Sequence, residues 1–113
     1  MTRVSKIAGA PPYAVETALK RLGANIRTAR LRRGLRLDEL AAKIGLSRFA
    51  LSDVEKGKPT TGIAAYVGAL WALGLLGDME TVASPDRDEE GKTLEAARRP
   101  KTAHGSRKLD NEF

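Results

Sequence analysis

The sequence predicts an all-α protein, with a compact five-helix domain followed by a flexible, charged C-terminal tail. The length of 113 residues fits a single hydrophobic core. Apolar residues recur at helical spacing through the first two thirds of the chain. Glycines interrupt this pattern at Gly34, Gly45 and Gly57. Because a glycine just beyond a helix is a common stop signal, these positions predict three helix ends.

Residues 1–12 are predicted to form a loose arm, since they are small or polar and end in two prolines. The helical domain is expected over residues 13–83. Its first helix runs from Tyr13 to Arg33, with Gly23 as a possible weak point, and its second from Leu37 to Ile44. Ser47 is a good N-cap for a third helix that reaches Lys56.

Thr60 or Thr61 is expected to cap a fourth helix that ends at Leu73, and a short fifth helix covers residues 76–83. The predicted buried stripe of the fourth helix consists of Ile63, Tyr66, Val67, Leu70 and Leu73. Trp71 is expected in the core or at a dimer interface. Residues 84–113 are charged, contain two prolines and are expected to be disordered in isolation, with a transient helix between Asp88 and Arg99.

The charge distribution favours a partner rich in phosphate. The formal net charge is +6 and the sequence pI is about 10.0. Residues 1–83 contain 13 basic and 7 acidic side chains, whereas residues 84–113 contain 7 of each. The excess positive charge therefore belongs to the predicted helical domain, where the first helix and its exit carry a run of cations.

The composition argues against several function classes. The chain has no cysteine and a single histidine, His104, so we expect no metal site and no disulfide. No nucleophile with a neighbouring base and no phosphate-binding glycine loop can be assembled, so we expect no enzymatic activity and no cofactor. The longest apolar run is too short for a membrane helix, and no signal peptide is recognisable. We therefore expect a cytoplasmic protein.

The second and third predicted helices meet at Gly45, an arrangement that predicts a helix-turn-helix from about Leu37 to Lys56. The third helix would lie in the major groove of DNA, where residues near its N-terminus reach base edges. The expected base contacts are Arg48, Phe49, Ser52 and Asp53. The expected phosphate contacts are Arg30, Arg36, Ser47, Lys56 and Lys58.

The stretches Ala-Ala-Lys-Ile-Gly-Leu-Ser (41–47) and Leu-Ser-Asp-Val-Glu-Lys-Gly (51–57) resemble the Xre/Cro family of phage and bacterial repressors over about residues 22–75. This resemblance implies a lambda-repressor-like fold and action as a homodimer on a palindromic operator in double-stranded DNA. It also implies a structural ion pair between Arg30 and Glu55. The chain departs from the family at Leu37, where a polar residue is common, and at Asp53, where a neutral or basic one is.

The layout is also similar to that of Hip-type antitoxins, repressors encoded with a HipA-like kinase toxin. The features concerned are the apolar run 69–76 and the charged stretches 85–88 and 97–101. The resemblance implies an autoregulating antitoxin that also holds the kinase toxin, and the charged tail is the best candidate for binding a protein partner. Two alternatives remain open. One is a free-standing phage-type or stress regulator, and the other is a protein-interaction adaptor without sequence-specific DNA binding.

Overall fold

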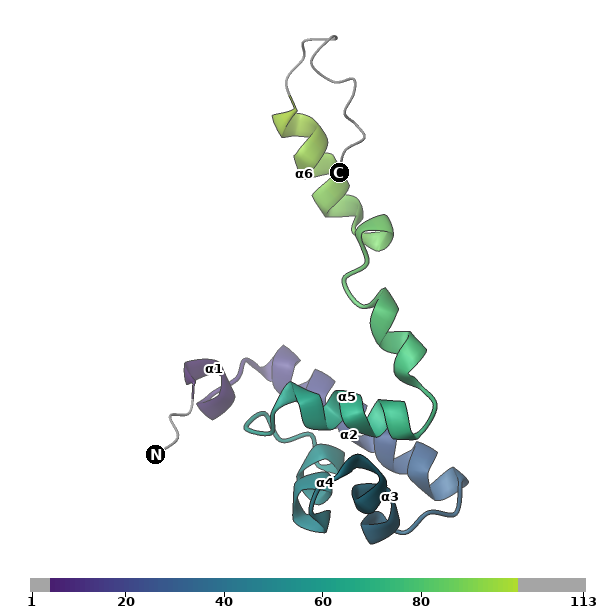
Figure 1. Ribbon diagram of the computed structural model, residues 1–113. Coiled ribbons are helices and arrows are strands. Elements are labelled where there is room, and N and C mark those ends of the chain that lie inside the picture. The colour runs from purple at the N-terminus through teal and green to yellow at the C-terminus, as the bar shows by residue number, and fades with distance from the viewer. Residues whose placement is uncertain (1–4, 100–113) are drawn as a thin grey trace. The chain divides into compact units, whose positions relative to one another are not determined.

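The computed structural model describes residues 5–99, and this part of the chain is helical with no strand (Figure 1). The predicted all-α class is confirmed. The elements are α1 (Lys6–Gly9), α2 (Tyr13–Arg32), α3 (Leu37–Ile44), α4 (Arg48–Glu55), α5 (Ile63–Ala72), the 3-10 helices η1 (Leu76–Thr81) and η2 (Pro85–Arg87), and α6 (Glu89–Arg98). The chain divides into two units after Met79. The predicted tail beyond residue 99 lies outside the described residues.

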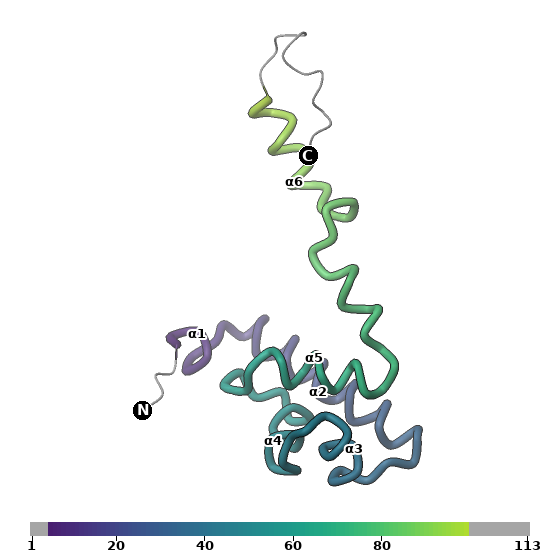
Figure 2. The backbone as a smooth tube through the Cα atoms, viewed as in Figure 1, coloured from purple at the N-terminus to yellow at the C-terminus, as the bar shows by residue number. Residues whose placement is uncertain are grey.

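In the first unit, α2 packs against α4 and α5, while α3 packs against the same two helices. Figure 2 shows α3 and α4 joined by a short turn, with α5 running over them. The buried apolar side chains come from all four of these helices and form one core: Ile26, Ala29, Leu40, Ala41, Leu51, Val54, Tyr66, Ala69, Leu70 and Leu73. This core holds the predicted turn between α3 and α4 in a fixed geometry.

The predicted bounds of the first three long helices agree with the structure to within one or two residues. Gly34, Gly45 and Gly57 each follow a helix end with φ of +66°, +86° and +71°. Such left-handed values suit glycine, since it has no Cβ. At the start of α4, the Oγ atom of Ser47 accepts a hydrogen bond from the N–H of Ala50 at 3.1 Å. The predicted N-cap is thus confirmed.

Three predicted elements differ from the structure. Residues 6–9 of the arm form α1, because the Ser5 hydroxyl accepts a hydrogen bond from the N–H of Ala8. Helix α5 begins after Gly62 and not after a threonine cap, since Thr61 lies in a turn in which its N–H bonds to the carbonyl of Lys58. The predicted fifth helix is a 3-10 helix over Leu76–Thr81 rather than an α-helix.

The buried face of α5 also differs from the prediction. Ile63 is 67% exposed, because the first turn of α5 extends beyond the core, and Ala69 is buried in the stripe instead. Trp71 is 60% exposed, which excludes it from the core of this unit. Periodicity identified α5 as a helix but not the orientation of its faces, because nearly every residue in it is apolar.

The described part of the second unit, residues 80–99, is a short helical segment in which no residue is buried. It contains η2 and α6, which contact each other. Asp88 caps α6, with its Oδ1 atom accepting a hydrogen bond from the N–H of Gly91 at 2.9 Å. The part of the predicted tail that the structure describes is therefore helical over Glu89–Arg98, close to the helix expected there.

Candidate nucleic-acid interface

The turn between α3 and α4 is closed by backbone hydrogen bonds. The N–H groups of Gly45 and Leu46 both donate to the carbonyl of Ala41, at 2.9 Å each. The αL conformation of Gly45 ends α3 and allows the N-cap of α4, Ser47, to follow two residues later. Leu40 and Ala41 of α3 and Leu51 and Val54 of α4 are buried against each other's helices. The two helices therefore form the predicted helix-turn-helix.

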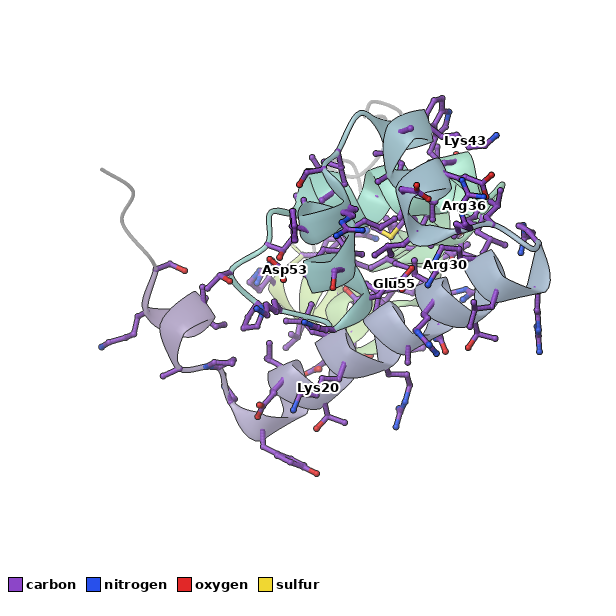
Figure 3. All side chains as sticks on the ribbon, turned by 90° about the horizontal axis from the view of Figure 1, so that it is seen from below. Lys20, Arg30, Arg36, Lys43, Asp53 and Glu55 are labelled. Carbon is purple, nitrogen blue, oxygen red and sulfur yellow. The ribbon has the colours of Figure 1, made fainter. Side chains whose placement is uncertain are left out.

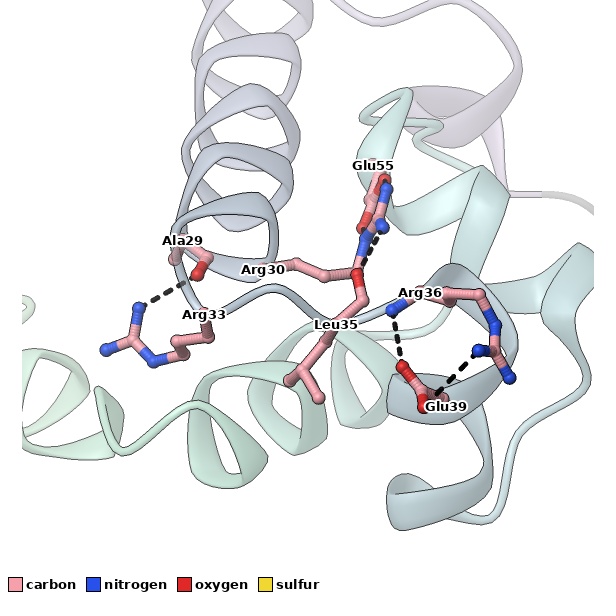
Figure 4. A network of polar contacts seen from close by, with 7 residues as sticks. All are labelled: Ala29, Arg30, Arg33, Leu35, Arg36, Glu39 and Glu55. Atoms are coloured by element: carbon pink, nitrogen blue, oxygen red, sulfur yellow. Dashed lines mark hydrogen bonds and ion pairs between the residues drawn. The ribbon is translucent and has the colours of Figure 1, made fainter.

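A buried ion pair fixes the C-terminal end of α4 to α2 (Figure 4). The Nε and Nη2 atoms of Arg30 donate to the two carboxylate oxygens of Glu55, at 2.6 and 3.0 Å. The Nη1 atom of Arg30 donates to the carbonyl of Leu35 at 2.9 Å. The hydrogen bond to Glu55 raises the pKa of the Arg30 guanidinium above its ordinary value, against the opposing effect of burial. The structure contains the ion pair that the resemblance implied.

The second role expected for Arg30, a phosphate contact, does not fit its position. The residue is 7% exposed, and its guanidinium is held by Glu55 and the Leu35 carbonyl. A phosphate would have to compete with a bidentate carboxylate for the same N–H groups. Arg30 is therefore a structural residue that sets the angle between α2 and α4.

A direct backbone contact, which sequence reasoning missed, complements the ion pair. A Cβ atom on Gly23 of α2 would lie 2.5 Å from the carbonyl oxygen of Val54 and 2.7 Å from that of Glu55. A Cβ atom on Gly57 would collide with the backbone of Leu19 and Lys20. Gly23, expected to be a weak point, is thus the place where α2 touches the end of α4. Its position in the middle of a long helix was the only sequence signal for such a contact.

The outward face of α4 carries all four residues that were predicted to touch bases. Arg48 and Phe49 are exposed at the N-terminus of the helix, and Phe49 is 71% exposed. Ser52 and Asp53 follow one turn later and are half-buried. The Arg48 guanidinium lies over the Phe49 ring, 5.3 Å from its centroid, which favours a cation-π contact. The structure thus gathers the four side chains at one helix face.

Asp53 is paired with Lys58, a residue expected to bind phosphate. The Lys58 Nζ atom lies 3.3 Å from Oδ1 of Asp53, with both side chains about half exposed. Figure 3 shows Asp53 near the end of α4, on the side of the domain that also presents Lys20. Lys56 is exposed at the C-cap of α4 and was likewise expected to bind phosphate. The pairing neutralises Asp53, whose charge would otherwise oppose the approach of DNA.

Arg36, another expected phosphate contact, is the N-cap residue of α3. Its guanidinium lies 3.2 Å from Asp38 and 3.7 Å from Glu39, and its side chain is 72% exposed. Its N–H donates to Glu39 at 2.8 Å (Figure 4). Leu37, where the resemblance would place a polar residue, packs against the core instead. The N-terminus of α3 therefore offers one cation whose charge is balanced by its own acidic neighbours.

Tyr66 connects the segment after α4 to the core. Its hydroxyl donates to the carbonyl of Lys58 at 2.8 Å, and the residue is 2% exposed. Burial, followed by the nearby charge of Asp53, raises the pKa of Tyr66. This contact holds the chain that carries Lys58 close to the C-terminus of α4.

None of the helices between residues 5 and 99 combines the length and apolar content that a membrane crossing requires. A search of curated proteins and a search of solved structures found no match to the chain. A family model described as a helix-turn-helix domain matches residues 21–81, which is more than half of the chain and includes α3, the turn and α4. The chain belongs to the helix-turn-helix family and is a DNA-binding regulator.

Proposed function

We propose that the chain is a sequence-specific transcriptional repressor that binds a palindromic operator as a homodimer, with a lambda-repressor-like domain. The observation that carries this proposal is the exposed face of α4, on which Arg48, Phe49 and Ser52 gather while Arg30 and Glu55 hold the helix from behind. A helix presented in this way fits the major groove of B-DNA. The proposed activity is binding rather than catalysis, and it needs no cofactor.

Each residue at the interface has a distinct proposed role. Arg48 is suited to a bidentate contact with guanine, and Phe49 to packing on a thymine methyl group. The Ser47 hydroxyl, which already accepts from Ala50, retains its own O–H for a phosphate at the start of α4. Lys56 and Lys58 supply sequence-independent attraction to phosphates beyond the helix end.

The test is selection of genomic DNA fragments by the purified protein at moderate salt, followed by sequencing. Moderate salt suppresses binding to phosphates alone. We expect enrichment of an inverted repeat whose half-sites lie about 34 Å apart, one turn of DNA. Absence of any enriched sequence would contradict this function and favour the protein-interaction adaptor.

Arg48→Ala, measured on the selected site by fluorescence anisotropy, then tests the role of α4. We expect a loss of about 10- to 100-fold on the selected site, in line with one bidentate base contact of about 1–3 kcal/mol. Random DNA should be affected much less. Arg87→Ala, an exposed arginine in η2, is the matched control and should change neither affinity. An equal loss on both DNAs would make Arg48 a phosphate contact.

A second candidate function is that of an autoregulating antitoxin paired with a HipA-like kinase toxin. It is supported by the resemblance to Hip-type antitoxins and by the described part of the second unit. Among residues 80–99, Val82 and Leu94 are 64% and 53% exposed and no residue is buried. An exposed helical segment of this kind can dock into a groove on another protein. Co-expression with the product of the adjacent gene and co-purification tests this function. If that gene encodes no kinase-like protein, the regulator is a free-standing one.

A further inference from the structure

A surface hollow lies beside the C-terminal half of α2, outside the helix-turn-helix. It has a volume of about 340 Å³ and is lined by side chains of α2 together with one residue that follows α5. We call it the α2 hollow. Its lining contains two arginines, two uncharged polar residues and two apolar residues, and no acidic residue: Asn25, Thr28, Ala29, Arg32, Arg33 and Leu75.

The helical repeat of α2 places the α2 hollow opposite the contact with α4. Gly23 and Arg30 meet α4 through its backbone and through the buried ion pair. Asn25 and Arg32 each follow one of these residues by two positions, which corresponds to about 200° around the helix. Figure 4 shows the side chains of Arg30 and Arg33 leaving α2 on opposite sides. The body of α2 therefore separates the hollow from the helix that is proposed to enter DNA.

Two guanidinium groups give the α2 hollow a positive charge that the protein itself does not balance. Arg32 is exposed, and its side chain has no ion pair or hydrogen bond with any residue between 5 and 99. Arg33 donates from Nη1 to the carbonyl of Ala29 at 2.9 Å, which fixes its guanidinium and leaves its other N–H groups for a ligand. Residues 17–37 include no acidic side chain. These two arginines thus differ from Arg36, whose charge is balanced by its neighbours.

The uncharged residues of the lining supply hydrogen bonds and an apolar wall. The Asn25 amide and the Thr28 hydroxyl are exposed and can each donate a hydrogen bond to an oxygen atom. Ala29 is buried and Leu75 is half-buried, so they offer a surface on which the organic part of a small molecule can pack. Guanidinium groups bind phosphate through paired N–H groups. The volume lies at the lower end of the range for small-molecule sites.

We propose that the α2 hollow binds a phosphoryl group, which the guanidinium groups of Arg32 and Arg33 contact and to which Asn25 and Thr28 donate hydrogen bonds. Such a group has two sources, a free organic phosphate or the backbone of a second nucleic-acid segment. The size of the hollow and its apolar wall favour a free organic phosphate. The proposal does not depend on the recognition of an operator by α4.

Nuclear magnetic resonance of the isotope-labelled full chain, without DNA, tests the site. Inorganic phosphate is titrated at constant pH and ionic strength, so that general screening does not change. We expect saturable shifts of the amide signals of Asn25, Thr28, Arg33 and Leu75, with a dissociation constant in the millimolar range for an open site. Absence of these shifts, or equal shifts at exposed cations throughout the chain, would overturn the proposal.

Arg32→Gln removes the positive charge of an exposed side chain and keeps its capacity to form hydrogen bonds, so the variant should fold normally. We expect the dissociation constant for inorganic phosphate to rise about fivefold or more. Arg27→Gln is the matched control, because Arg27 is also an exposed arginine of α2 but does not line the α2 hollow. It should leave the dissociation constant nearly unchanged, and equal effects of the two variants would contradict the assigned site.

Adenosine monophosphate and labelled DNA distinguish the two sources. A free organic phosphate as the ligand predicts that adenosine monophosphate shifts the same amide signals at lower concentration than inorganic phosphate does. A second duplex as the ligand predicts energy transfer between donor-labelled and acceptor-labelled duplexes mixed with the protein. Arg32→Gln should abolish this transfer and Arg27→Gln should preserve it. If neither adenosine monophosphate nor a second duplex bound at the hollow, the proposal would be wrong, and binding of inorganic phosphate would be that of an adventitious ion only.

Discussion

A guanidinium and a carboxylate that are both removed from water stabilise a protein only while both are present. The side chains of Arg30 and Glu55 are 9% and 7% exposed, and their bidentate contact joins α2 to α4. Removing Glu55 would leave Arg30 with the carbonyl of Leu35 as its remaining partner. The cost is then mainly that of an unpaired buried charge.

We expect Glu55→Ala to lower the free energy of unfolding by about 3–5 kcal/mol, the usual cost of breaking a buried ion pair from one side. Urea denaturation measures this directly. Glu16→Ala is the control, because Glu16 pairs with Lys20 on the exposed side of α2 at 3.4 Å. Such a surface pair contributes about 0–1 kcal/mol. Similar losses in the two variants would argue against a structural role for the buried pair.

The ion pair between Asp53 and Lys58 weakens the electrostatic interaction of each side chain with the phosphates of DNA. Replacing Asp53 with Asn removes a negative charge from the face of α4 and releases the Lys58 ammonium from its carboxylate. We expect Asp53→Asn to bind random DNA more tightly, with a slope of log affinity against log salt that is steeper by about 0.9, as for one added phosphate contact. Asp86→Asn in η2 is the control. A weaker affinity for one selected site alone would instead identify Asp53 as a base contact.

Tyr66 gives the first unit a defined response to alkaline pH. Because burial raises its pKa above the ordinary value of about 10, the folded chain retains the phenolic proton after the unfolded chain has lost it. The contribution of the Tyr66 hydroxyl to the free energy of unfolding is therefore fully present below about pH 10. It is lost as the pH rises through the raised pKa. We expect Tyr66→Phe to remove this part of the decline, at a cost of about 1–3 kcal/mol at neutral pH for the unpaired Lys58 carbonyl.

Denaturation at a series of pH values, comparing Tyr66→Phe with the unchanged chain, isolates this effect from the titration of other groups. Tyr13→Phe is the matched control, since Tyr13 is 82% exposed. Its stability should follow that of the unchanged chain at every pH. If the stability of Tyr66→Phe also followed that of the unchanged chain at every pH, the hydroxyl of Tyr66 would have no role in the pH response.

Among the elements, those whose ends are set by local chemistry could be predicted from the sequence. Gly34, Gly45 and Gly57 end helices at positive φ, and Ser47 caps α4, so the helix-turn-helix and its outward residues followed from the residue pattern. What depends on tertiary contacts could not be predicted. The exposure of Trp71 and the pairing of Asp53 with Lys58 arise from the orientation of faces that have no distinguishing local signal.

The contact between α2 and α4 reverses an ordinary expectation for a helix. In a helix interior, changing Gly to Ala normally stabilises by about 0.8–1 kcal/mol. At position 23 the added methyl group would meet the backbone of Val54 and Glu55, which cannot move without shifting α4. We therefore expect Gly23→Ala to lower the thermal midpoint of unfolding and to weaken operator binding. Gly77→Ala, with open space around it, should change neither.

For the whole molecule, the distribution of charge predicts which unit accounts for the attraction to DNA. Residues 84–113 have as many acidic as basic side chains, so a chain shortened to residues 1–83 keeps the net charge of +6. We expect this shortened chain to bind DNA with an unchanged salt dependence, measured by fluorescence anisotropy between low and moderate salt. A shallower dependence would mean that basic residues of the removed segment contact phosphates.

The contact of Gly23 with the end of α4 is made by main-chain atoms, and the neighbouring ion pair lies on the inner side of that helix. Neither depends on which side chains occupy positions 48, 49 and 52. New combinations at these three positions should therefore alter the preferred operator with little loss of stability. The domain is in this sense a scaffold on which specificity can evolve, or be engineered, separately from folding.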